Sequence, residues 1–157
     1  LELGVKGATY AFLGPLIGSI IRMSWGIFCD RMGGAIWTFI SGVGMAITMG
    51  AIAWVLTNPT GMTDFYIFLG LMLAMFLFSG FGNAGTFKPM PMIMPARQAG
   101  GAIGVTAAIA SLGPFLGGVA LSAISAPVFF LGCSIFCALC SVLCWVMYAR
   151  KNAPFPG

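Results

Sequence analysis

A single arginine inside a long apolar segment is the residue best suited to chemistry in this sequence. Arg22 lies eight positions before Asp30, so it sits about 12 Å from the hydrophilic end of its segment at 1.5 Å per helical residue. A charge at that depth in a bilayer costs at least about 2.5–3.5 kcal/mol and is normally kept for function. The planar guanidinium can hold a flat oxyanion through two parallel hydrogen bonds. We therefore expect Arg22 to bind an anion.

The acidic residues of the sequence leave this charge without a partner at the same depth. Glu2, Asp30 and Asp64 all lie at the ends of apolar segments. The counter-charge must come from the substrate or from protein outside this sequence, and a purely structural ion pair with such protein is the alternative to anion binding. The sequence has no histidine and no cluster of polar residues suited to catalysis. We expect no enzyme activity, no metal and no cofactor.

Composition indicates that these residues belong to a membrane protein. Hydrophobic residues make up 60 % of the chain, charged residues make up 6 %, and the mean hydropathy is +1.05, whereas soluble domains are roughly one quarter charged. Five continuously apolar segments of about 22–24 residues are each long enough to cross a bilayer, and their lack of alternation excludes a membrane β-barrel. The sequence predicts an all-α unit over residues 1–157 with five transmembrane helices, at about residues 7–29, 35–57, 65–86, 100–123 and 127–148.

The basic residues set the expected orientation of these helices. Most of them follow the first, third and fifth segments, and the two opposite connections carry none; the residues in question are Arg31, Lys88, Arg97, Arg150 and Lys151. By the positive-inside rule this side is cytoplasmic, with Lys6 alone on the other side. The net charge of +4 therefore reflects membrane orientation, and nucleic acid is not an expected partner.

The beginning of the sequence predicts that the chain is part of a larger bundle. Leu1–Lys6 shows no basic-then-apolar pattern of a signal peptide. Five spans that start outside the cell imply an odd number of preceding spans, and seven would make twelve. The N-terminal half of the same protein is then an expected partner, together with the lipid bilayer.

The first hydrophilic connection carries a recognisable motif. The stretch Gly26-Ile-Phe-Cys-Asp30-Arg31-Met-Gly33-Gly34 resembles the inner-loop signature of the major facilitator superfamily, G-x-x-x-D-R-x-G followed by a basic residue, except that Gly34 replaces the basic residue. An aspartate at a helix end can dock on the positive N-terminus of a neighbouring helix. We expect these residues to act in the conformational cycle, and a plain hydrophilic turn is the alternative.

A glycine-rich stretch at the end of the third segment suggests close helix packing. Gly80-Phe-Gly82-Asn83-Ala-Gly85 matches the dinucleotide fingerprint formally, but it follows an apolar span rather than a strand of a βαβ unit. We expect Gly82, Asn83 and Gly85 to serve gating. A faint inverted repeat relates Gly14-Pro-Leu-Ile-Gly18 to Gly113-Pro-Phe-Leu-Gly117, and small residues that only permit close packing are the alternative.

Together these motifs resemble the nitrate/nitrite porter family of the major facilitator superfamily. The likeness rests on G-P-L-I-G-S-I-I-R, D-R-M-G-G, G-F-G-N-A-G-T-F-K-P-M-P and R-Q-A-G-G-A-I-G-V-T-A-A-I-A-S-L-G-P-F, so it covers nearly the whole chain. It implies that the chain forms spans eight to twelve of a twelve-span fold, within the C-terminal six-helix bundle. It also implies that Arg22 binds the anion with a second arginine from another span.

The resemblance extends to further site residues. A glycine-rich nitrate signature falls on about Gly104–Gly118, which includes Ser111 and Gly113, although Ala107, Ala108 and Ala110 stand where more glycine is expected. Phenylalanines that sandwich the flat anion are also implied, and Phe76 and Phe78 lie at a suitable depth. Most aromatic residues in such helices only pack, which is the alternative for these two.

Four cysteines form a stripe along the last segment. Cys133, Cys137, Cys140 and Cys144 spread over about 16 Å of one helix, so they cannot converge on one metal ion with bonds of about 2.3 Å. A disulfide framework of secreted domains does not apply inside a membrane segment. We interpret the four thiols as small apolar side chains.

The expected function is secondary active transport of nitrate and nitrite across the inner membrane by alternating access, with the C-terminus in the cytoplasm. The five spans contain no carboxylate or histidine away from their ends, so they offer no proton carrier, and arginine stays charged. This favours exchange of nitrate for nitrite. The alternatives are nitrate/proton symport and a facilitator that carries another small or organic anion.

The orientation can be tested by cysteine labelling in intact cells. Single cysteines placed at residues 88–97 of the full-length protein should resist a membrane-impermeant thiol reagent, because the positive-inside rule places this connection in the cytoplasm. Cysteines at residues 58–64 should react. Labelling of the first set from outside would show that the topology is inverted.

Overall fold

The computed structural model describes residues 10, 12–26, 28–29, 33–58, 61–87, 90 and 95–153. Asp30 and Arg31 of the loop motif and Lys88 of the orientation argument lie outside the described residues. The described part is helical and contains no strand. The prediction of an all-α architecture is confirmed.

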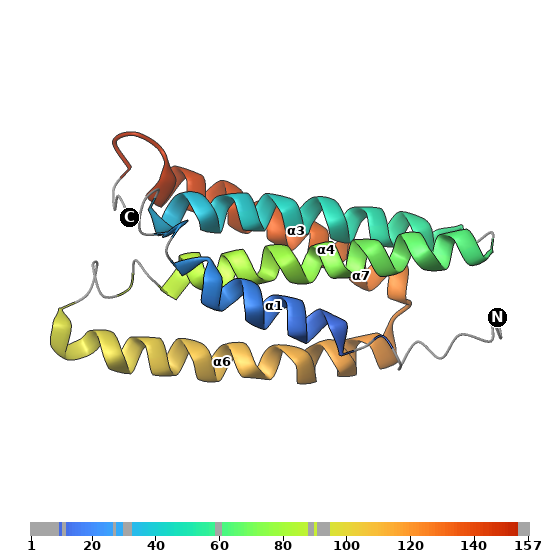
Figure 1. The fold of residues 1–157 in the computed structure, drawn as a ribbon, viewed down its shortest axis with the longest axis horizontal. Helices are drawn as coiled ribbons and strands as arrows, with labels where there is room; N and C mark the ends of the chain where they lie inside the picture. Colours follow the sequence, from blue (N-terminus) through green and yellow to red (C-terminus); the bar gives the residue numbers. More distant parts are fainter. Residues whose placement is uncertain are drawn as a thin grey trace.

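Within the residues that the structure describes, five helices follow one another along the chain. They are α1 (Leu13–Ser24), α3 (Gly34–Thr57), α4 (Met62–Phe87), α6 (Ala96–Ala123) and α7 (Ala126–Cys144), and a five-residue π-helical turn η2 (Trp145–Ala149) extends α7. Figure 1 shows that successive helices run in opposite directions with roughly aligned axes. The ends of α1, α4 and α7 therefore lie at one end of the bundle together with the beginnings of α3 and α6.

Four of these helices are long and apolar enough to cross a bilayer, namely Gly34–Thr57, Met62–Phe87, Arg97–Ala123 and Ala126–Ala149. The first helix differs from its predicted range. α1 has 12 residues, about 18 Å at 1.5 Å per residue, where the sequence predicted a span over residues 7–29. Trp25 is a turn residue that ends α1. Gly26, Phe28 and Cys29 are helical again, and Cys29 N donates to Trp25 O at 3.0 Å, so helical geometry continues toward the loop motif after this break.

Helix α3 is the central element of the bundle. It packs against α4 on one side and against α7 on another, while α1 packs on α4. Most of its buried residues are small, including Gly34, Ala35, Ser41 and Gly44. Lipid tails are as apolar as leucine, so helices in a membrane associate through close packing and interhelical hydrogen bonds. Small residues on α3 permit that close packing on both sides.

Two serine hydroxyls connect α3 to its neighbours. Ser41 Oγ on α3 donates to Phe78 O on α4 at 2.6 Å, and Ser134 Oγ on α7 donates to Ala46 O on α3 at 2.6 Å. Hydrogen bonds of this kind between membrane helices contribute about 0.6–2 kcal/mol each. They give each interface a polar contact that also fixes the register of the two helices.

The glycine-rich end of α4 brings backbones into close approach. A Cβ added to Gly85 would lie 2.8 Å from Gly34 O on α3, and one added to Gly80 would lie 3.0 Å from Gly18 O on α1. A Cβ on Gly82 would overlap Ser41 Oγ. Close backbone approach, which the sequence suggested for these glycines, is what the structure shows here.

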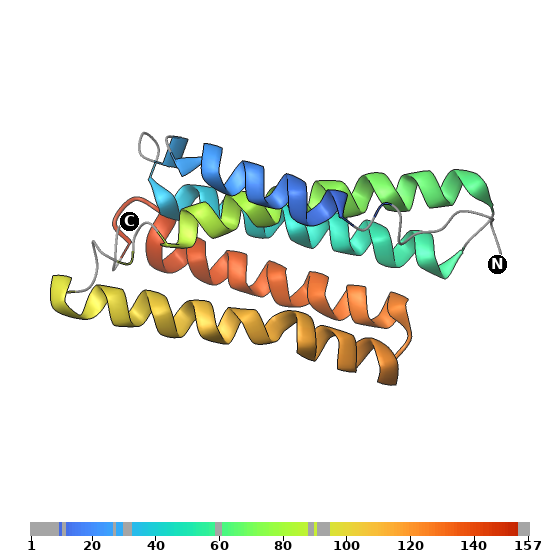
Figure 2. The same ribbon diagram turned by 60° about the horizontal axis from the view of Figure 1, so that its bottom comes forward.

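Helix α6 lies apart from this tightly packed group. Its main contact is with α7, and the two helices run side by side in Figure 2. Apolar side chains project from it into the surroundings over its whole length: Val105, Ile109, Leu112, Phe115, Leu116, Val119 and Leu121 are all exposed. In this respect α6 differs from α3, whose neighbours cover two of its sides.

The tight contact at Gly85 can be tested by a matched pair of alanine substitutions. Gly85→Ala should lower the melting temperature of the purified full-length protein, because the new Cβ meets backbone atoms of α3 and overpacking costs about 1–3 kcal/mol. Gly104→Ala, where a Cβ would meet nothing within 4 Å, should leave the melting temperature unchanged or raise it through better helix propensity. Equal melting temperatures for the two variants would contradict the close α3–α4 contact.

Candidate anion-binding site

Arg22 lies in the last turn of α1 and is exposed. Its Cζ atom stands 5.6 Å from the centroid of the Phe87 ring, at the end of α4. A cation over an aromatic face is stabilised by about 0.5–1 kcal/mol at an exposed site. This contact places the guanidinium where the ends of α1 and α4 meet.

Within the described residues, Arg22 forms no ion pair and no hydrogen bond. Its position near the C-terminus of α1 is favourable, because the helix dipole places partial negative charge at that end. A guanidinium carries five N–H donors and no acceptor. These donors are therefore not taken up by any described carboxylate, as the distribution of acids in the sequence predicts.

Phe76 and Phe78 lie at two different helix interfaces. The Phe76 ring covers Gly14 of α1, where an added Cβ would overlap it. The Phe78 ring covers Gly44 of α3 in the same way and lies 6.0 Å from the Phe81 ring, centroid to centroid. Each ring thus fills the space above a glycine. The structure does not bring the two rings together around one shared space.

The two candidate residues on α6 stand away from this region. Ser111 is exposed, and its Oγ donates to Ala108 O of the same helix at 2.7 Å. Gly113 is also exposed, and an added Cβ would meet no atom within 4 Å. Since α6 packs mainly on α7, neither residue is held against the helix that carries Arg22.

The described glycines of the loop motif differ in backbone conformation and in the space around them. Gly33 precedes α3 with a φ of 88°, a left-handed conformation that favours glycine over residues with a side chain. Gly26 has open space around it. Asp30 and Arg31 lie outside the described residues, so their expected role in the conformational cycle stays a prediction.

The gating candidates of α4 are packed against α3. Gly82 and Gly85 are buried, and both face backbone or hydroxyl atoms of α3. Asn83 between them has a buried Oδ1 atom without a hydrogen-bond partner. A buried amide oxygen without a partner loses about 1–3 kcal/mol of hydrogen-bonding free energy, so Asn83 is a polar group that the described part of the chain leaves unsatisfied.

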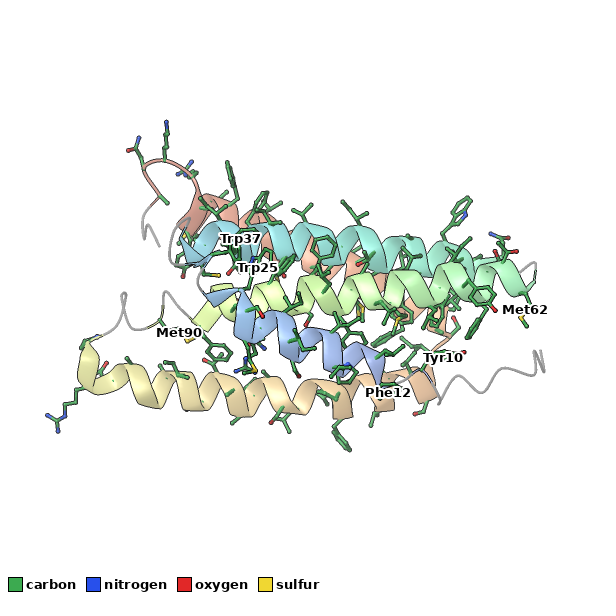
Figure 3. All side chains as sticks on the ribbon, in the orientation of Figure 1. Tyr10, Phe12, Trp25, Trp37, Met62 and Met90 are labelled. Carbon is green, nitrogen blue, oxygen red and sulfur yellow. The ribbon has the colours of Figure 1, made fainter. Side chains whose placement is uncertain are left out.

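An aromatic cluster lies next to the loop motif, at a place where the sequence predicted no functional residue. The Trp25 ring lies 4.3 Å from the Phe81 ring and 5.1 Å from the Trp37 ring, centroid to centroid. Figure 3 shows Trp25 and Trp37 beside each other where α1 ends and α3 begins. The sequence signal for this cluster is the position of the two tryptophans on either side of the loop motif. The cluster joins α1, α3 and α4 at the end that carries Arg22.

The two halves of the proposed inverted repeat have different surroundings. Gly14 and Gly18 pack against Phe76 on α4, as small residues do at close interfaces. Gly113 has open space, and Gly117 meets only the tip of the Phe129 ring at 3.7 Å. Close packing therefore explains the first copy alone.

Curated proteins that are similar to this chain include an antiporter and two transporters of nitrate and nitrite, as their names describe them. The "Probable nitrate/nitrite antiporter NarK2" of Thermus thermophilus is 46 % identical over 94 % of this chain and 34 % of its own length. The "Nitrate/nitrite transporter NarU" of Escherichia coli K12 is 29 % identical over 90 % of this chain and 36 % of its own length. NarU of Salmonella typhimurium is 27 % identical over the same shares.

The chain spans about a third of the length of these relatives. No protein-family profile matches it, and no solved structure matches it. The relatives are named as transporters rather than enzymes, in agreement with the prediction of no enzyme activity. Four long apolar helices and this homology identify a multi-pass membrane protein. The chain is homologous to nitrate/nitrite transporters of the major facilitator superfamily over about a third of their length, which confirms the family resemblance seen in its motifs.

Proposed function

We propose that this chain forms spans eight to twelve of a twelve-span transporter that moves nitrate and nitrite across the inner membrane by alternating access. The observation that carries the proposal is the Arg22 guanidinium, which lies in an apolar segment and has no described acid beside it. The names of the relatives support the choice of substrate.

Arg22 supplies the charge that attracts the anion. Its planar fork of donors matches two oxygens of nitrate or nitrite. The guanidinium carbon lies over the Phe87 ring, 5.6 Å from its centroid, and the N–H donors of the guanidinium are not taken up by any described residue. The second arginine that the family implies belongs to a span outside this chain. Asp30 and the glycines of α4 then act in the change of conformation rather than in binding.

The arrangement of the helices supports the proposed orientation. Arg97 follows the beginning of α6, and Arg150 and Lys151 follow η2. Because successive helices alternate in direction (Figure 1), these three residues share the end of the bundle where α1 and α4 finish. Basic residues gathered at one end are expected on the cytoplasmic side, which places the C-terminus inside the cell.

The absence of a titratable group at depth favours exchange over proton symport. Asp64, the one acid of α4, lies in the first turn of that helix, and the sequence has no histidine. An empty site would expose the positive charge of Arg22 during the crossing, whereas a bound monovalent anion brings the site closer to neutral. Obligatory exchange of one anion for another follows. Nitrate/proton symport, or transport of another small or organic anion, are the competing functions.

The role of Arg22 can be tested with two substitutions in the full-length transporter. Arg22→Lys keeps the charge but loses the bidentate fork, so transport should be strongly reduced while insertion stays normal. Arg22→Ala should weaken nitrate binding by about 2–5 kcal/mol, the usual loss when one partner of a buried charge-assisted pair is removed. Equilibrium binding to purified protein measures this, with Arg97→Ala as a control that removes a charge at the beginning of α6. Wild-type affinity in Arg22→Ala would refute the assignment.

Exchange can be tested in vesicles that contain the purified full-length protein. Uptake of labelled nitrate should occur when the vesicles hold nitrite or nitrate and should be near background when they hold only a large impermeant anion. The physical reason is the uncompensated charge of Arg22 in an empty site. Strong uptake into anion-free vesicles under a pH gradient alone would establish symport instead.

A further inference from the structure

A cavity of about 350 Å³ lies between α3, α4, α6 and α7. Its polar lining comes from hydroxyl groups and one amide, among them Thr38, Ser41, Ser79, Asn83, Thr106 and Ser141. None of its described lining residues carries a charge. One water takes about 30 Å³ of liquid volume, so the space can hold an anion of three or four atoms together with several waters.

Part of this polar lining is already used in the fold. Thr38 Oγ1 donates to Gly34 O at 3.0 Å, Ser41 Oγ donates to Phe78 O at 2.6 Å, and Ser141 Oγ donates to Cys137 O at 2.7 Å. A hydroxyl has a single hydrogen to donate. These three groups stabilise helices and interfaces and offer little to a ligand.

Other lining groups are still available as donors. Ser79, Asn83 and Thr106 form no side-chain hydrogen bond within the described residues. The Oδ1 atom of Asn83 is buried and has no hydrogen-bond partner among the described residues, and the same amide carries an NH₂ group with two donors. Two hydroxyls and one NH₂ group, with no lining carboxylate among the described residues, suit an electron-rich ligand better than a cation.

The cavity shares a wall with the candidate anion site. Phe87 lines the cavity, and the guanidinium of Arg22 stands over the same ring at 5.6 Å from its centroid. A fixed positive charge beside a low-dielectric opening raises the local concentration of anions. An anion released from Arg22 therefore has a neighbouring space with neutral donors.

We propose that this cavity is a second, weak subsite for the transported oxyanion, next to Arg22 and distinct from it. This inference rests on the proposed function. Neutral donors replace part of the hydration shell without the strong attraction of a full charge, so an anion can enter the subsite and leave it again. Conduction pathways require this combination of binding that permits entry and weakness that permits exit.

The natural cysteines of α7 provide a probe of the cavity. Cys140 lines it, whereas Cys133 on the same helix does not. Two forms of the full-length transporter would keep only one of these cysteines and be treated with a small anionic methanethiosulfonate reagent. Nitrate should slow the modification of Cys140 by about tenfold when its concentration is ten times the Kd of the subsite, by mass action. Modification of Cys133 should be unaffected, with gluconate at equal ionic strength as the reference.

Substitutions of the lining donors separate this subsite from the Arg22 site. Asn83→Leu and Thr106→Val remove a donor with little change of shape and should each weaken the protection of Cys140 by nitrate. Ser122→Ala, on α6 outside the cavity, is the matched control and should keep that protection. Arg22→Ala should lose transport. It should keep the protection of Cys140 by nitrate, although at higher nitrate concentrations.

Each alternative outcome has a distinct meaning. If nitrate never protects Cys140 although transport still depends on Arg22, the cavity holds only water, and the subsite is refuted while the proposed function stands. If protection disappears in Arg22→Ala and survives in both donor variants, it reports a conformational change and the subsite is again refuted. Wild-type nitrate affinity in Arg22→Ala would refute the proposed function itself, whatever the labelling shows.

Discussion

The close approach of α3 to its two neighbours is the constraint on which the rest of this structure depends. On the α4 side, Gly34 and Gly44 of α3 face Gly85 and the Phe78 ring; on the α7 side, Gly42 faces the Ser141 hydroxyl. Larger side chains at these positions would separate the helices, and lipid supplies no hydrophobic force to bring them back. Because α3 and its neighbours are close, serine hydroxyls reach carbonyls of the neighbouring helix.

Close helix packing also determines where the Arg22 guanidinium lies. Helix α1 is short, and it is held on α4 by Gly14 beneath the Phe76 ring and by Gly80 beside Ile21. That packing aligns the last turn of α1 with the end of α4 and brings Arg22 over Phe87. The guanidinium is thus positioned by helix packing and one aromatic face, and its donors are left for a ligand. The aromatic cluster of Trp25, Trp37 and Phe81 braces the same end.

Phe76 and Phe78 show that depth along a helix does not determine what surrounds an aromatic ring. The two rings are two residues apart, so they leave α4 in different directions, one toward α1 and the other toward α3. The residue type and the depth are the same for a ring that packs on a glycine and for a ring that covers an anion. Which of the two applies depends on the neighbouring helix, and here each ring has a glycine beneath it. The proposed sandwich would therefore require these rings to leave their interfaces.

The helices, their order and the uncompensated arginine were determined by the sequence itself, because length and hydropathy of a segment are local properties and the positions of the few acids can be read directly. The glycine-rich stretch of α4 likewise predicted close packing. Only the tertiary structure decided the partners: Gly85 with Gly34, Ser134 with Ala46, and Arg22 with Phe87. It also decided the cavity around Asn83 and the break at Trp25 that ends α1. These features arise between residues far apart in the chain, where side-chain shape and backbone distance, rather than spacing, select the contact.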